Sequence, residues 1–222
     1  MPDYALGRRE APDGRDRNYP MRALLVRRGG LPPPRRFRYW TIGPVLDQGA
    51  APSCVGHGWR QWMTTSPTRT KSGPDALTIY QEAQKIDEWP GEDYAGTSVR
   101  AGVKYLQGLG RVAEYRWAST VEEMMGWLSE RGPVVIGVNW FTGFLTPAGG
   151  GLIVPTGKDE GGHCVLLYGY NRTYELFRGV NSWGRSWGSG GRFNFSFDTM
   201  RLLLGMGADV CAAVEVPGGG MG

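Results

Sequence analysis

The chain has 222 residues, a length that fits one domain or two small lobes packed around a single cleft. Its 41% hydrophobic and 12% aromatic content is ordinary for a globular chain that buries a core. No apolar run reaches the roughly 18 residues of a membrane span, and no apolar stretch follows the first charged residues. We therefore expect neither a membrane segment nor a secretory signal peptide. Three cysteines without CxxC spacing exclude a disulfide framework and a cysteine-based zinc site, and they favour a reducing compartment.

The net charge of +4 is unevenly distributed along the chain. Residues 1–38 hold ten arginines and four acidic residues, an excess of +6, whereas the remainder has a net charge of −2. Pro32–Pro34 predict an extended segment without a helix. We expect residues 1–43 to form an irregular arm that lies over the globular body and is retained. Because aromatic residues are not interleaved with its arginines, a solvated or docked arm is favoured over nucleic-acid binding.

Four helices are predicted after the arm. The first begins at Cys54, with Ser53 as its N-cap, and runs to about Thr65. Gly56 and Gly58 within it each cost about 1 kcal/mol of helix propensity relative to alanine. Such a helix persists only when it is packed on all sides.

The other three helices carry boundary signals. The second begins at Pro74-Asp75 and runs to about Trp89, with one face formed by Leu77, Tyr80, Ala83 and Ile86. Thr97-Ser98 cap the third, which ends at Gly108 or Gly110. The fourth begins with the capping box Ser119-x-x-Glu122 and ends at Gly132-Pro133.

After Pro133 the pattern becomes strand-like. Five β-branched or alternating runs separated by glycines predict strands: "VVIGVNW", "HCVLLYGY", "YELFRGVNSW", "GRFNFSF" and "VCAAVEV". Helices come first and strands second, which predicts an α+β chain of two segregated lobes over residues 44–216, with a glycine-rich tail at 217–222. A site is expected in the cleft between the lobes.

Cys54 stands at a predicted helix amino terminus, where unpaired N–H groups and the positive end of the helix dipole lower a thiol pKa. An activated cysteine also needs a base, and the sequence contains two histidines. His57 lies three residues later on the same helix and is predicted to be structural. His163 opens the run "HCVLLYGY" after two glycines, so it can face Cys54 across a cleft. Cys164 and Cys211 are predicted to be buried thiols.

Two further polar residues complete the predicted site. Asn181 ends a strand that would pair with the strand of His163, so its amide can accept the imidazole N–H and fix the tautomer. Trp183 can cover that hydrogen bond from water. Gln48, six residues before Cys54, can donate a side-chain N–H to a developing oxyanion, with the Cys54 backbone N–H as the second donor.

Gln48, Cys54, His163 and Asn181, in this order, resemble the papain family of cysteine peptidases. "DQGAAPSC" is similar to the family's Q-G-x-C-G-S-C segment, "GGHCVLLYGY" to its histidine strand, and "NSWGRSWGSGGRF" to its N-S-W-G-x-x-W-G-x-x-G segment. The resemblance covers roughly residues 44–216. It implies a two-lobed fold in which a helical lobe bears Cys54 and faces an antiparallel sheet or barrel lobe across the active-site cleft.

The resemblance extends to the expected substrate-binding residues. "GEDYAGTSVRAGVKYLQGLG" is similar to the family's cleft-wall glycine and the helix after it, which makes Gly96 the wall residue. Trp183 is expected to line the cleft. Asp209 is expected near the pocket that selects the residue before the scissile one, where it would favour a basic residue.

The chain departs from the family pattern around the nucleophile. A disulfide-bonded cysteine, a glycine, an aromatic residue and a polar neighbour of the histidine are replaced by Ala51, Pro52, Val55 and Gly162, respectively. His163 follows Cys54 by 109 residues, fewer than the roughly 130–150 common in the papain group. These departures affect the expected substrate pocket and pH profile rather than the catalytic trio.

We therefore expect a cysteine endopeptidase that acts on a peptide or protein through a Cys-His-Asn triad and a thioester acyl-enzyme. Two alternatives stay open: an amidase or isopeptidase with the same machinery, and an inert papain-fold binding or assembly component, for example of a phage particle. No metal or organic cofactor is expected, nor a nucleic-acid or membrane partner, although an assembly partner for the arm stays open. The arm and the missing disulfide suggest a bacterial or phage protein that is cytoplasmic or virion-associated.

Overall fold

The computed structural model describes residues 4–26 and 34–216, so the predicted tail at 217–222 lies outside the described residues. Its α-helices are α1 (Cys54–Thr64), α2 (Ala76–Gln84), α3 (Val99–Gly108), α4 (Val121–Glu130), α5 (Thr142–Leu145) and α6 (Phe197–Gly205). Its 3-10 helices are η1 (Gly14–Asn18), η2 (Met21–Leu24) and η3 (Gly149–Gly151). Its strands are β1 (Phe37–Tyr39), β2 (Val112–Trp117), β3 (Val134–Phe141), β4 (Asp159–Asn171), β5 (Leu176–Val180), β6 (Arg192–Ser196) and β7 (Asp209–Glu215).

The strands form a sheet in the order β2-β7-β3-β4-β5-β6, and β1 pairs with the end of β4. Every one of these pairings is antiparallel. The long strand β4 pairs with β3 from Val134↔Leu167 to Phe141↔Asp159 and with β5 on its other side. The predicted α+β class with an antiparallel sheet is confirmed.

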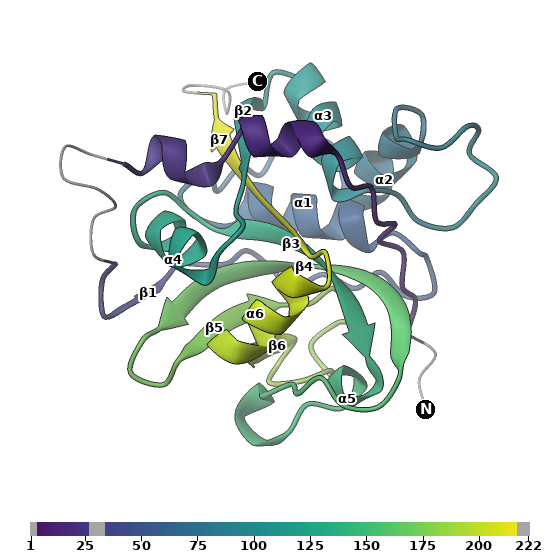
Figure 1. Ribbon diagram of the computed structural model, residues 1–222. Helices are drawn as coiled ribbons and strands as arrows, with labels where there is room; N and C mark the ends of the chain where they lie inside the picture. Colours follow the sequence, from purple (N-terminus) through teal and green to yellow (C-terminus); the bar gives the residue numbers. More distant parts are fainter. Residues whose placement is uncertain (1–3, 27–33, 217–222) are drawn as a thin grey trace.

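Alternate side chains of the sheet enter two hydrophobic cores. Val135 packs with the core of α1 and α3 that contains Trp59, whereas Ile136 packs with an aromatic core that contains Trp140. Successive residues of a strand point to opposite faces, so one strand serves both cores. Figure 1 shows α1, α2 and α3 on one side of β3 and β4, with α5, α6 and the β5–β6 hairpin on the other. The first turn of α1 therefore lies against the sheet.

The second helix is shorter than predicted, and its buried face differs. α2 ends at Gln84, and Leu77 and Ile86 are each 48% exposed. The buried face contains Ile79, Tyr80 and Ala83, which follow the i, i+1, i+4 spacing of one helix side. Beyond the helix, the chain turns because the Asp87 carboxylate binds groups from the following loop.

Ser53 is the N-cap residue of α1 as predicted, but the hydrogen bonds of two predicted caps differ from the prediction. Ser53 makes no cap hydrogen bond, because its hydroxyl lies 3.2 Å from Nδ1 of His57 instead. At the start of α4 the capping box is shifted by one residue. The Thr120 hydroxyl accepts the Glu123 N–H at 3.2 Å, and the Glu123 carboxylate accepts the Ser119 N–H at 2.9 Å.

The predicted division into helices first and strands second is also too strict. β2 precedes α4, and α5 and α6 lie among the later strands. β2 has no clean alternation of buried and exposed residues, and it is fixed by pairing with the last strand, β7. α6 begins where the Ser196 hydroxyl accepts the Thr199 N–H. His163 does not open its strand, because β4 begins four residues earlier, at Asp159.

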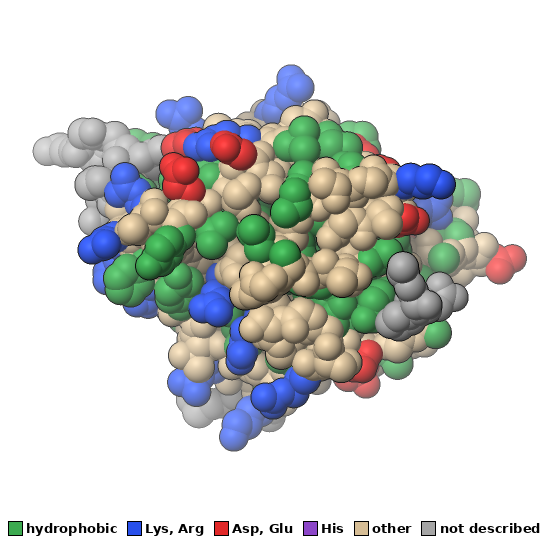
Figure 2. Space-filling view, turned by 90° about the horizontal axis from the view of Figure 1, so that it is seen from below, with side chains coloured by type: hydrophobic (Ala, Val, Ile, Leu, Met, Phe, Trp, Pro, Cys, Tyr) green, Lys and Arg blue, Asp and Glu red, His purple; other side chains and the backbone are tan. Residues whose placement is uncertain are grey.

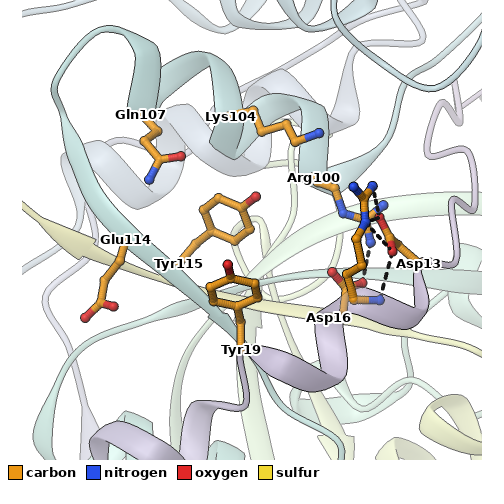
Figure 3. Close-up of a pocket in the computed structure, with 9 residues that line it drawn as sticks. Asp13, Asp16, Tyr19, Arg100, Lys104, Gln107, Glu114 and Tyr115 are labelled. Atoms are coloured by element: carbon orange, nitrogen blue, oxygen red, sulfur yellow. Dashed lines mark hydrogen bonds and ion pairs between the residues drawn. The ribbon is translucent and has the colours of Figure 1, made fainter.

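The amino-terminal arm packs along the body through residues 4–26 (Figure 1). Asp16 of η1 pairs with Arg100 of α3, whose guanidinium also donates to the Ala11 carbonyl at 2.9 Å. Tyr19 and Tyr115 line a cavity of about 310 Å³ between the arm and the body (Figure 3). Among the helices of the described ranges, none has the length and apolarity to cross a bilayer.

Candidate active site

Cys54 is the first residue of α1, and its side chain is fully buried. Burial raises the pKa of the Cys54 thiol to about 12, although the backbone of Cys164 and of Gly7 favours the thiolate and offsets part of that rise. The link to the Cys164 backbone places the sulfur beside β4, at the residue that follows His163 in the chain. In this arrangement the thiol is uncharged at neutral pH.

His163 of β4 is bonded to Asn181, the residue that follows β5. Its Nε2 lies 2.8 Å from Asn181 Oδ1, and the same oxygen accepts the Ser182 N–H at 2.8 Å. Because that oxygen can only accept, Nε2 carries the proton and Nδ1 is the basic nitrogen. Nδ1 is buried without a hydrogen-bond partner among the described residues. It is therefore the nitrogen that is free to accept a proton.

Two indole rings enclose the imidazole of His163. The ring centroid of Trp183 lies 4.6 Å away with the planes tilted by 30°, and that of Trp140 lies 4.6 Å away, edge-on at 72°. Both tryptophans are buried, so little water reaches the bond between His163 and Asn181. Burial lowers the pKa of His163 to about 4, and the hydrogen bond to Asn181 offsets this only in part. The imidazole is therefore neutral in this state.

Gln48 is buried ahead of α1, with its amide held in one orientation. Its Oε1 accepts a hydrogen bond from the Ser182 hydroxyl at 2.6 Å, which turns Nε2 toward two carbonyl oxygens. Nε2 donates to the Ala51 carbonyl at 2.8 Å and to the Ala5 carbonyl of the arm at 3.1 Å. An amide donor that already holds a peptide carbonyl can stabilise an oxyanion at the same position.

The arm crosses this site as an extended segment, residues 4–9. The Gly162 carbonyl accepts the N–H groups of Gly7 at 3.2 Å and Arg8 at 3.0 Å. On the opposite side, the Thr97 N–H donates to the Gly7 carbonyl and the Thr97 carbonyl accepts the Arg9 N–H, both at 2.9 Å. The arm runs parallel to the Thr97 segment and is bonded to both walls of the cleft. The arm therefore occupies the site beside Cys54 as an extended peptide with backbone hydrogen bonds on both sides.

Glycines and an aromatic ring shape the walls that the arm contacts. A Cβ at Gly162 or at Gly96, whose φ is +86°, would overlap the backbone of the arm. The ring of Tyr4 stacks on Trp183 with centroids 4.2 Å apart and planes 9° apart. The predicted wall residue Gly96 and the predicted cleft residue Trp183 thus both contact the peptide in the site.

The Arg8 side chain is buried against Asp209, the first residue of β7. Its Nε and Nη2 lie 3.0 and 2.8 Å from one Asp209 oxygen, and Nη2 also donates to the Gly207 carbonyl at 3.0 Å. The Arg8 side chain is 2% exposed and that of Asp209 16%. Burial raises the pKa of Asp209, and the guanidinium partly offsets that rise. A side chain at Gly137 would fill the space that Arg8 occupies.

Each sequence-predicted site residue lies at the arm segment or next to a residue that contacts it. These residues are Gln48, Cys54, His163, Asn181, Gly96, Trp183 and Asp209.

The remaining histidine and cysteines lie outside the cleft, as predicted. His57 Nδ1 is 2.9 Å from the Ser53 carbonyl inside α1, and burial lowers the pKa of His57. Cys164 and Cys211 are fully buried in the core beneath α1. Neither histidine is visible on the face of the molecule in Figure 2, in keeping with their burial.

Sequence reasoning missed several groups that shape the site. Ser182 orients Gln48, and its place beside Asn181 in the "NSWG" segment was the available signal. Trp140 packs on His163 from β3, and a single tryptophan in a strand run carries no such signal. The segment "ALGRR" at residues 5–9 enters the cleft, and nothing local in these five letters predicts that placement.

Comparisons with known proteins agree with this geometry. Residues 74–211, more than half of the chain, match the papain family cysteine proteases; this stretch includes His163 and Asn181 but begins after Cys54. Over 91 residues, 40% of the chain and 29% of the relative, the chain is 33% identical to cathepsin B of Dictyostelium discoideum. Over 199 residues, 68% of the chain and 64% of the relative, it is 22% identical to an uncharacterised peptidase C1-like protein of Acanthamoeba polyphaga mimivirus. The chain thus spans less than two thirds of either relative.

Two solved structures share the fold over nearly the whole chain. Xylellain, a cysteine protease from Xylella fastidiosa, superposes with a TM-score of 0.69 at 22% identity, covering 97% of this chain and 95% of its own. A digestive procathepsin L2 proteinase from the larval midgut of Tenebrio molitor superposes with a TM-score of 0.70 at 18% identity, covering 95% and 78%. The matched family stretch and the papain-like arrangement of lobes together show that this chain belongs to the papain family of cysteine proteases.

Proposed function

We propose that the protein is a cysteine endopeptidase, with Cys54 as the nucleophile, His163 as the general base and acid, and Asn181 as the residue that orients His163. The observation that carries the proposal is the contact between Gln48 Nε2 and the Ala5 carbonyl, because a peptide backbone already occupies the site. The fixed tautomer of His163 supports it, since Nδ1 is free to take the thiol proton.

The reaction follows from these atoms. His163 Nδ1 takes the proton of the Cys54 thiol, and the sulfur attacks the carbonyl carbon of the peptide. The carbonyl oxygen becomes an oxyanion that receives the Gln48 Nε2–H and the Cys54 N–H. The C–N bond then breaks, and the amine leaves with the proton from His163. Water attacks the resulting thioester as His163 takes its proton; the C–S bond then breaks, and His163 returns the proton to the sulfur, which releases the acid and restores the thiol.

In this proposal, the state with the arm in the cleft is the resting state of the enzyme. Burial holds the Cys54 thiol and the His163 imidazole in their neutral forms while the arm excludes water. Once the arm leaves, the helix amino terminus and solvent favour the thiolate again.

Asp209 gives the proposed enzyme a preference for a basic residue close to the scissile bond. The support is Arg8, whose side chain is 2% exposed and whose guanidinium donates to the Asp209 carboxylate. Cleavage of a peptide library by the full chain should favour arginine at this position, and Asp209→Asn should remove that preference. If Asp209→Asn keeps the preference for arginine, Asp209 binds the arm but does not select the substrate.

Labelling by a peptidyl epoxide tests the nucleophile. With reductant present, mass spectrometry of the wild type and of Arg8→Ala should find the adduct on Cys54, faster in Arg8→Ala, and no adduct in His163→Ala. The wild type and Arg8→Ala should hydrolyse a peptide library, and Cys54→Ala should not. No adduct and no hydrolysis in a folded Arg8→Ala variant would reject the peptidase proposal in favour of an inert binding module.

A further inference from the structure

The arm places a second arginine in a site of its own, next to Arg8. The guanidinium carbon of Arg9 lies 4.2 Å from the ring centroid of Trp89 and 4.3 Å from that of Tyr94. The two rings are 6.3 Å apart at 69° to each other, so they contact the cation from two sides. Cation–π attraction of this kind favours a planar guanidinium over a neutral side chain.

The aromatic pair is held by the body rather than by the arm. The Asp87 carboxylate accepts the Tyr94 hydroxyl at 2.5 Å, the Trp89 N–H at 3.2 Å and the Thr97 hydroxyl at 2.6 Å. Gln84 Nε2 donates to the Tyr94 carbonyl at 2.9 Å. These bonds fix the loop before a ligand arrives, which lowers the conformational cost of binding.

The charge of this loop suits a cationic ligand. Burial and the Asp87 hydrogen bond raise the pKa of Tyr94 to about 12, so its ring faces Arg9 as a neutral phenol. The segment "DEWPGEDY", residues 87–94, contains four acidic residues and no basic one. Acidic side chains around a cleft attract basic ligands and raise their local concentration.

The two arginine sites lie at consecutive positions along one extended backbone. Arg8 is bonded through its N–H to Gly162, and Arg9 through its N–H to Thr97, on opposite walls of the cleft. Gly7, which precedes them, lies against the Pro52 carbonyl, two residues before Cys54, and its backbone favours the Cys54 thiolate. A peptide with two adjacent basic residues therefore fits both sites while its neighbouring residue lies near the nucleophile.

We propose that Trp89 and Tyr94 form a second arginine-binding subsite beside Asp209, so that the cleft selects peptides with two consecutive basic residues. This proposal rests on the proposed peptidase function. The arm segment Gly7–Arg9 is then the built-in occupant of the sites that a substrate uses.

The test uses the full chain as the variant Arg8→Ala/Arg9→Ala, in which the arm no longer places arginine side chains in the two sites; this variant is called the unloaded arm. Internally quenched peptides carry Arg-Arg-Gly-Leu-Ala or Ala-Leu-Gly-Arg-Arg, so that both chain directions are covered. In each, the arginine that corresponds to Arg9, or the one that corresponds to Arg8, is replaced by the neutral isostere citrulline. We expect citrulline at the Arg9-like position to lower kcat/KM by about 3- to 30-fold.

The variant Trp89→Ala, added to the unloaded arm, separates the two subsites. It should bring the arginine-to-citrulline ratio at the Arg9-like position close to one, while the ratio at the Arg8-like position, which depends on Asp209, stays unchanged. Tyr174→Ala is the matched control, because Tyr174 is an aromatic residue that is 73% exposed. An unchanged ratio in folded Trp89→Ala would overturn the proposal and leave the aromatic pair as a clamp for the arm.

A binding measurement keeps the proposal testable if no peptide is cleaved. In that case the peptidase function fails, and calorimetry with the same peptides on Cys54→Ala/Arg8→Ala/Arg9→Ala measures the subsites directly. If the citrulline peptide binds more weakly than the arginine peptide, and if this difference is lost in Trp89→Ala, the second subsite is supported. Equal binding of both peptides rejects it.

Discussion

Replacing Arg8 by alanine should open the arm over Cys54. The guanidinium makes two hydrogen bonds to the Asp209 carboxylate and one to the Gly207 carbonyl, and its side chain is 2% exposed. Hydrogen bonds to charged groups contribute about 1.5–3 kcal/mol each. Since two of the three share one oxygen of a partly exposed carboxylate, we assign about 3 kcal/mol to the set. At 1.4 kcal/mol per factor of ten, the open fraction should rise about 100-fold.

Alkylation of the thiols by iodoacetamide, followed by peptide mass spectrometry, measures that fraction. Cys54 reports opening of the arm, and Cys164 and Cys211, both fully buried in the core, report global unfolding in the same sample. Arg17→Ala is the matched control, because Arg17 is an exposed arginine of the same arm. An unchanged Cys54 rate in folded Arg8→Ala would refute the argument that this ion pair closes the site. Equal acceleration at all three cysteines would show unfolding instead.

Three further measurements follow from the site and its packing. The imidazole of His163, followed by ¹⁵N NMR, should stay neutral down to about pH 4 in the wild type, because burial disfavours its charged form; in Arg8→Ala its pKa should rise toward about 6.5. Gln48→Ala should lower kcat by roughly 10²- to 10³-fold with little change in KM, and a large rise in KM alone would argue against oxyanion stabilisation. Gly102→Ala should lower the Tm, since its Cβ would overlap the Trp59 indole at a cost of about 1–3 kcal/mol, whereas Gly108→Ala at the end of the same helix meets nothing within 4 Å and should not. Equal shifts in both variants would contradict the packing argument.

The site was predictable from the sequence where its residues lie in short, spaced segments. The interval from Gln48 to Cys54 and the "NSWG" segment each fix local geometry. In the structure Ser182 joins Gln48 to Asn181, and Asn181 is bonded to His163. The sheet partners of these segments were likewise visible as β-branched runs. Residue types in short segments were therefore sufficient to predict both the fold class and the candidate catalytic residues.

The rest depends on partners that are distant in sequence. β2 is a strand because it pairs with β7 at the end of the chain, which no pattern within residues 112–117 shows. Arg8 and Asp209 are 201 positions apart, so their pairing could not be inferred from spacing. Ser53 was a reasonable N-cap by residue type, but a histidine one turn later competes for its hydroxyl. In each case a tertiary contact overrides the local preference.

On the proposals above, specificity and self-inhibition share one set of contacts. The pocket of Asp209 and the rings of Trp89 and Tyr94 hold the arm closed, and the same groups would hold a substrate. A ligand that takes these groups must displace the arm, so its observed affinity is lowered by the fraction of molecules in the closed state. A variant that weakens recognition of paired arginines therefore also weakens the closed state. Such a variant should hydrolyse poor substrates faster and basic substrates with less preference, a combination that general damage to the fold does not produce.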